Sequence, residues 1–190
     1  IKLIAYSERH QIQTEGSLSL NIWVAPSLIP KSHPLATVEG VNNAILIEGD
    51  PIGEIMLYGP GAGSGPTASS VVSDIINLQA RTSENITAID KLLSFDFWKD
   101  CHIIDDAQIT KKNYLRIICL DTPGVIGKIG DIFGKNNVSI ESIVQLDASE
   151  NKAEIVVITH DVTNGNFEKS KEEINALFEV KLIASQLSCI

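Results

Sequence analysis

Residues 113–135, NYLRIICLDTPGVIGKIGDIFGK, decide the fold of the C-terminal half of this chain. Tyr114 to Leu120 alternates in the manner of a strand with one buried face. After a turn at 121–123, apolar side chains recur at helical spacing between Gly124 and Lys135; they are Val125, Ile126, Ile129, Ile132 and Phe133. The stretch therefore predicts a strand that is followed at once by an amphipathic helix.

The same order of elements repeats along the rest of the chain. Strand character returns at 138–146, a turn is expected at 149–151, and a strand, a helix and a strand follow at 152–159, 167–178 and 180–187. The order β-α-β-β-α-β is the split βαβ arrangement of a ferredoxin-like domain. Right-handed crossovers then place both helices on one face of a four-stranded antiparallel sheet. The other face needs a partner or polar side chains.

The N-terminal half predicts a smaller mixed or antiparallel sheet with a covering helix. Short runs rich in branched side chains predict three strands, at 18–25, 44–48 and 52–58. Gly49-Asp50-Pro51 predicts a hairpin turn between the last two strands. Apolar spacing beyond residue 67 predicts a helix that Thr67 or Ser69 would cap. The predicted fold class of the whole chain is therefore α+β.

A glycine-rich run, YGPGAGSGPTAS at 58–69, joins the predicted hairpin to this helix. Glycine has no Cβ and so lets a ligand approach the backbone, and a helix N-terminus favours anions. Neither established phosphate signature is complete, because a P-loop would need Gly-Lys-Ser/Thr and the dinucleotide fingerprint is broken. A ligand loop and a plain strand-to-helix turn both remain open.

Charge and composition exclude several classes of partner. The net charge of −9 argues against binding to nucleic acid or to an anionic membrane surface. No apolar run approaches the roughly 20 residues of a membrane helix, and the first residues lack the zones of a signal peptide. We therefore expect a cytoplasmic protein.

The three cysteines, Cys101, Cys119 and Cys189, are odd in number and widely spaced. This usage fits a reducing compartment, and we expect all three to be buried thiols. Cys101-His102 lies close to Asp105-Asp106, but the ligand spacing of a zinc site is absent. We therefore expect no metal site there.

The turn at 121–127, DTPGVIG, has the features of a small-molecule site. Pro123 suits the first turn of a helix, Asp121 or Thr122 is a natural cap, and Gly124 leaves the backbone uncovered. A small amino acid could rest its carboxylate on the free N–H groups of the first turn and place its ammonium against a carboxylate. The alternative is that these residues simply start a helix.

Two groups of motifs resemble the homoserine dehydrogenase family. Residues 1–80 resemble the closing part of its catalytic domain through VAPSLIP at 24–30, HPLA at 33–36, VNNAI at 41–45, GE at 53–54, YGPGAG at 58–63, PTAS at 66–69 and VVSD at 71–74. Residues 113–190 resemble the ACT regulatory domain through DTPGV at 121–125 and VSIESIVQ at 138–145. The two matches occur in the family's order, with 81–112 as a linker.

The resemblance implies an oxidoreductase that uses NADP or NAD to interconvert aspartate 4-semialdehyde and homoserine, on the route to threonine and methionine. The family's Rossmann domain and catalytic lysine would lie upstream of Ile1. No initiator Met is present and the chain begins in strand-like sequence, so we expect a truncated piece of a longer enzyme. We assign no catalytic residue to this piece and expect it to be inactive alone.

The resemblance also implies two binding sites. In the family the glycine loop lies beside the nicotinamide, which makes Gly59, Gly61 and Gly63 the candidate cofactor contacts. Asn42 and Asn43 receive only a structural role, as hydrogen-bonding turn residues.

The ACT domain implies feedback control by an amino acid, with threonine as the first candidate. Such domains usually bind it between two copies paired edge to edge, which implies a homo-oligomer. The candidate effector contacts are Asp121, Gly124 and Val125.

Two other functions remain open at the level of sequence. The chain could be a non-catalytic amino-acid sensor built from an ACT domain and a degenerate partner domain, or a structural dimerisation module. The reading frame upstream of Ile1 would separate them, and the missing Met favours a shortened enzyme.

Overall fold

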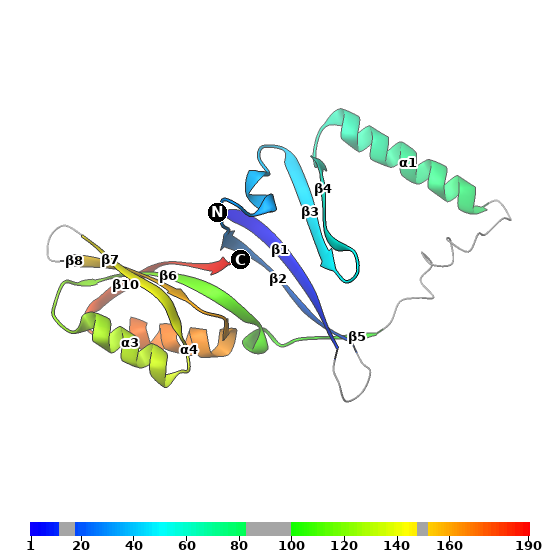
Figure 1. Cartoon of the computed structure of the whole chain (residues 1–190). Coiled ribbons are helices and arrows are strands. Elements are labelled where there is room, and N and C mark those ends of the chain that lie inside the picture. The colour runs from blue at the N-terminus through cyan, green and yellow to red at the C-terminus, as the bar shows by residue number, and fades with distance from the viewer. Residues whose placement is uncertain (12–17, 83–99, 148–151) are drawn as a thin grey trace. The chain divides into compact units, whose positions relative to one another are not determined.

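A computed structural model describes residues 1–11, 18–82, 100–147 and 152–190 (Figure 1). The chain forms two compact units, one made of Ile1–Ile29 with Cys101–Ile190 and the other of Pro30–Asp100. These units divide the chain differently from the predicted ranges 1–80, 81–112 and 113–190, because N-terminal strands pair with C-terminal ones. The assignment of those three ranges to a catalytic domain, a linker and an ACT domain stays a prediction.

The first unit contains an eight-stranded sheet. Its main path runs β1-β2-β10-β6-β8-β7, while β5 pairs with β2 and β9 with β6. The strands are β1 Lys2–Gln11, β2 Leu18–Leu28, β5 Cys101–Ile103, β6 Thr110–Leu120, β7 Ile140–Asp147, β8 Lys152–Thr159, β9 Val162–Thr163 and β10 Val180–Cys189. The antiparallel order β10-β6-β8-β7 confirms the predicted ferredoxin-like arrangement.

Two helices lie on one face of this sheet, as predicted (Figure 1). They are α3 Val125–Lys135 and α4 Asn164–Asn175. Leu115, Ile117 and Cys119 of β6 are fully buried, while the residues between them are half-exposed. Their buried side chains form one core with Ile129 and Phe133 of α3 and with side chains of β8 and α4. Period-2 burial of this kind is the physical basis of the strand prediction.

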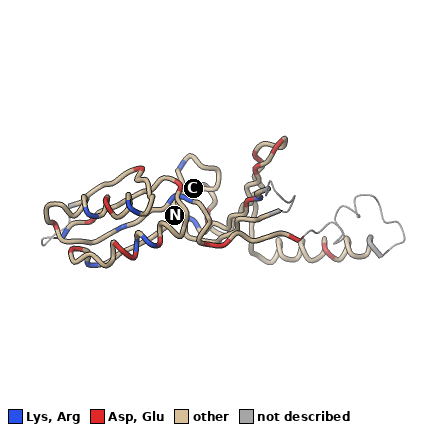
Figure 2. The backbone as a smooth tube through the Cα atoms, turned by 90° about the horizontal axis from the view of Figure 1, so that it is seen from below, with Lys and Arg blue, Asp and Glu red and all other residues tan. Residues whose placement is uncertain are grey.

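The opposite sheet face carries a paired charge. Arg116 donates from Nε and Nη2 to the two carboxylate oxygens of Glu154, at 2.6 and 2.7 Å. The hydrogen bond from Arg116 lowers the pKa of Glu154 below its ordinary value. Figure 2 shows acidic and basic residues interspersed along this unit, which agrees with a solvated surface rather than a basic stripe.

Two features of the first unit differ from the prediction. The sheet continues past the four predicted strands because Ser188 and Cys189 pair in parallel with Ser27 and Leu28. The predicted linker 81–112 contains β5 and the first residues of β6, which begins at Thr110. A strand of three residues such as β5 is too short to show a period-2 pattern. The apolar run 92–98 and the turn at 149–151 lie outside the described residues.

The second unit begins with the short helix η1 Pro34–Thr37 and the strands β3 Asn42–Gly49 and β4 Gly53–Pro60. The strands pair antiparallel from Asn42 opposite Pro60 to Gly49 opposite Gly53, which confirms the predicted hairpin. Helix α1 Ser64–Thr82 follows. Thr67 and Ser69 lie inside it, so the cap prediction is wrong. The helix starts early because Gly63, at φ 131, already turns the chain.

We expect Ile129→Ala to lower the free energy of unfolding of the first unit by about 2–5 kcal/mol, because the side chain is fully buried and its loss leaves a cavity. Ile126→Ala is the matched control on the same helix, where the side chain is 40% exposed and the expected loss is below about 1 kcal/mol. Urea unfolding measures both. Equal losses at the two positions would show that the helix does not pack through the face described.

Candidate functional site

The turn between β6 and α3 leaves the start of the helix without a side-chain cap. Gly124 occupies the N-cap position with φ 92 and ψ −6, in the left-handed region that favours glycine. Asp121 and Thr122 therefore do not cap the helix, and Pro123 precedes it, contrary to prediction. The first N–H groups of a helix have no intrahelical partner. The Val125 N–H donates to the carbonyl of Thr122 at 3.5 Å, so the N–H groups of Ile126 and Gly127 are the candidate donors to a ligand.

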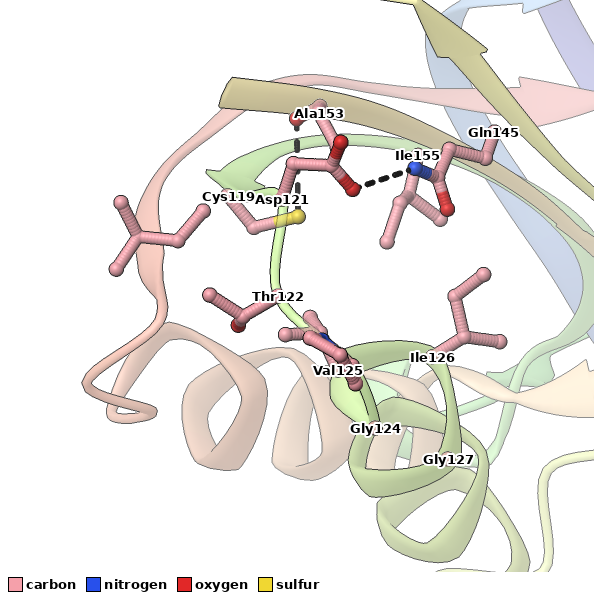
Figure 3. A pocket seen from close by; sticks show the side chains of 12 residues that line it. Cys119, Asp121, Thr122, Gly124, Val125, Ile126, Gly127, Gln145, Ala153 and Ile155 are labelled. Atoms are coloured by element: carbon pink, nitrogen blue, oxygen red, sulfur yellow. Dashed lines mark hydrogen bonds between the residues drawn. The ribbon is translucent and has the colours of Figure 1, made fainter. Parts of the chain in front are cut away.

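A cavity of about 450 Å³ lies at this turn (Figure 3). It is lined by residues 119–127 together with Gln145, Ala153 and Ile155. Gln145 Nε2 donates to Asp121 Oδ1 at 3.0 Å. Figure 3 shows this pair on the side of the cavity away from the first turn of α3. A carboxylate and a set of helix N–H groups thus face the same space.

The wall between them is apolar. Ala153 and Ile155 of β8 are buried, and so is Cys119, whose Sγ donates to the carbonyl of Ala153 at 3.6 Å. Burial raises the pKa of the Cys119 thiol, so it stays neutral and acts as a small apolar group. The cavity therefore offers an acidic end, an amide end and an apolar wall.

All three predicted effector residues, Asp121, Gly124 and Val125, line the cavity. Asp121 and Gly124 are exposed at the cavity, but the side chain of Val125 is 4% exposed and belongs to the core. Only the backbone of Val125 can reach a ligand. Gln145 was missed by sequence reasoning, because its place beside Asp121 depends on how β7, β8 and β6 are ordered.

The glycine loop of the second unit is bound to the start of β3. The Gly61 N–H donates to the carbonyl of Val41 at 2.9 Å, and Gly59 lies opposite Asn43 in the ladder. A Cβ on Gly59 would meet nothing within 4 Å, whereas a Cβ on Gly61 would lie 1.6 Å from Nδ2 of Asn43. The expected open space for a ligand is therefore present at Gly59 and filled at Gly61. Cofactor contact by the loop stays a prediction.

The three cysteines are free thiols in different surroundings. Cys119 is buried and Cys189 is half-buried, but Cys101 is exposed, so its predicted burial is wrong. The reason is that all of β5 is exposed.

Across residues 1–11, 18–82, 100–147 and 152–190, no three His, Cys, Asp or Glu side chains are grouped to hold a metal ion. Within the same ranges, no helix has both the length and the apolarity to cross a membrane.

Two protein-family models match this chain, one in each half. Residues 1–76 match the family model of homoserine dehydrogenase, and residues 113–179 match that of the ACT domain. The chain is therefore similar to homoserine dehydrogenase in its first part and to ACT domains in its last part. The glycine loop lies in the first match and the cavity in the second.

Proteins named homoserine dehydrogenase align with nearly the whole chain. A homoserine dehydrogenase from Synechocystis is 46% identical over 97% of this chain and 43% of its own length. One from Bacillus subtilis is 34% identical over 97% of this chain and 41% of its own. The crystal structure of a homoserine dehydrogenase from Thiobacillus denitrificans superposes with a TM-score of 0.80 at 26% identity, over 98% of this chain and 42% of that one. This chain thus spans about two fifths of the length of these homoserine dehydrogenases.

We expect Gly124→Ala to destabilise the ACT domain by about 1–2 kcal/mol, because a Cβ is strained at positive φ. Gly130→Ala, inside α3 and with open space around its Cβ, should instead stabilise the domain by about 0.5–1 kcal/mol. Thermal unfolding gives the sign of each change. A neutral or stabilising Gly124→Ala would mean that the turn does not adopt the left-handed conformation.

Proposed function

We propose that this chain works as part of a cytoplasmic homoserine dehydrogenase, which uses NADP or NAD to interconvert aspartate 4-semialdehyde and homoserine in threonine and methionine biosynthesis. The proposal is supported by the two family matches and by the names of relatives that align with 97% of the chain. Because the chain spans about two fifths of their length, we propose no catalytic residue within it.

A direct assay tests the proposed division of labour. The 190-residue chain alone should show no turnover with NADPH and aspartate 4-semialdehyde, because hydride transfer needs a positioned nicotinamide and a proton donor, and we assign no proton donor to this chain. Turnover near that of a full-length homoserine dehydrogenase would contradict this.

In the second unit we propose that the glycine loop approaches the cofactor through its backbone at Gly59, Gly61 and Gly63. The dinucleotide would supply the hydride chemistry when bound, and the loop would supply a close backbone surface. Gly59 supports this best, because it alone of the three has both ordinary backbone angles and open space beside it.

We expect Gly59→Val, made in a full-length homoserine dehydrogenase that contains these residues, to raise the KM for the dinucleotide by about tenfold, equivalent to ~1.4 kcal/mol of binding free energy. A Cβ at residue 59 meets nothing within 4 Å, so we assign the loss to the ligand. Gly65→Ala, also in open space but within α1, is the control and should leave this KM unchanged. An unchanged KM in Gly59→Val would remove the loop from the cofactor site.

In the ACT domain we propose a site for a small amino-acid effector, with threonine first. The single observation that carries it is the cavity between Asp121 and the uncapped start of α3. The carboxylate of the effector would accept from the N–H groups after Gly124, and its ammonium would donate to Asp121. The apolar wall suits a short side chain. We further propose that two copies associate through this domain, with a homo-oligomer as the working form.

Calorimetry with L-threonine tests the effector site. We expect heat of binding at up to millimolar ligand, and Asp121→Ala should weaken it by about tenfold or more, as loss of a charge-assisted hydrogen bond does. Asp131→Ala is the matched control, since Asp131 is an exposed residue of α3 outside the cavity lining. No heat with threonine or with any other amino acid would leave the domain as a dimerisation module.

A further inference from the structure

We propose that Asn43 is a positioning residue for the glycine loop, because its carboxamide fills the space that a side chain at residue 61 would need. Asn43 and Gly61 would then fix the path of the chain between β4 and α1 together. The functional consequence rests on the proposed contact between this loop and the dinucleotide.

The packing follows from the register of the β3–β4 hairpin. Asn43 stands directly opposite Gly59, so Gly61 is its diagonal neighbour and lies on the same face of the ladder. Because neither glycine has a side chain, the carboxamide of Asn43 is the one polar side chain that these three positions place on that face. It lies where a Cβ of residue 61 would be, at 1.6 Å for Nδ2 and 2.7 Å for Cγ.

The backbone of Gly61 does not itself require glycine. Its φ is not among the positive values, unlike those of Gly63 and Gly124. The requirement therefore comes from the neighbour, and a Cβ at 61 would force the short side chain of Asn43 into another rotamer. The same turn of chain is tied down by the Gly61 N–H, which donates to the carbonyl of Val41 at 2.9 Å. Movement of Asn43 should loosen this hydrogen bond.

This role differs from the turn-forming one that the sequence suggested. Asn42 does form the turn, since its Nδ2 donates to the carbonyl of Glu39 at 3.1 Å. Asn43 instead lies inside β3 and faces the loop.

A double-mutant cycle read by NMR tests the proposal in the 190-residue chain. The probe is the water-exchange rate of the Gly61 amide. We expect Gly61→Ala and Asn43→Ala each to speed the exchange of the residue-61 amide by about two- to tenfold. This factor corresponds to the free energy of displacing one side chain from its rotamer. The double variant should exchange more slowly than Asn43→Ala alone, because the new methyl group fills the space that the carboxamide left.

Gly59→Ala supplies the control pair. Its Cβ meets nothing within 4 Å, so its effect should simply multiply with that of Asn43→Ala. Unchanged amide shifts at Ile45 and Leu57 confirm that the hairpin is intact, and Asn43→Ser replaces Asn43→Ala if it is not. Rates in the Asn43–Gly61 double variant equal to the product of the single effects would overturn the proposal.

Enzyme kinetics test the positioning role of Asn43 separately from the proposed contact between the glycine loop and the dinucleotide. In a full-length homoserine dehydrogenase, Asn43→Ala should raise the KM for the dinucleotide and leave the KM for homoserine unchanged. If the exchange rates are coupled but no KM changes, the packing of Asn43 stands and cofactor contact by the loop is refuted. Uncoupled exchange rates refute the positioning role whatever the kinetics show.

Discussion

The structure of the first unit depends on the burial of one face of β6. This strand lies between β10 and β8, and its fully buried residues Leu115, Ile117 and Cys119 contact the core under both helices. A shift of register by one residue would exchange the buried and exposed faces along its whole length. Because the register is fixed in this way, the strand must end at a defined place, and the turn that follows must form beside β8 and within reach of Gln145 on β7.

Glycine is required after β6 and after β4 for two different physical reasons. Gly124 is required by its own φ of 92, and the turn that it makes leaves the start of α3 uncapped beside a cavity. Gly61 has ordinary backbone angles and is required by Asn43, which occupies its Cβ position. Composition alone treats the two glycines alike. The structure separates a turn that exposes N–H groups from a loop whose path is held by a neighbouring side chain.

Local periodicity predicted most of the fold. Four strands (β6, β7, β8 and β10), the helices α3 and α4, and the β3–β4 hairpin follow from spacing that neighbouring residues share. Pairing between distant segments could not be predicted, which is why the link between β2 and β10 and the three-residue strand β5 were missed. Of the site, Asp121 and Gly124 were predicted, whereas Gln145 and the contact of Asn43 with Gly61 depend on register. The helix caps were wrong because glycines at 63 and 124 turn the chain before the polar residues can act.

The site proposed for a small amino acid lies at the exit of β6. The most direct test is a titration of the isotope-labelled chain with L-threonine, followed by amide and side-chain NMR signals. We expect saturable shifts confined to residues 119–127 and to the side-chain amide of Gln145, which would exchange its bond to Asp121 Oδ1 for one shared with the ligand. Saturable shifts centred on another surface, with the signals of the turn unchanged, would contradict it.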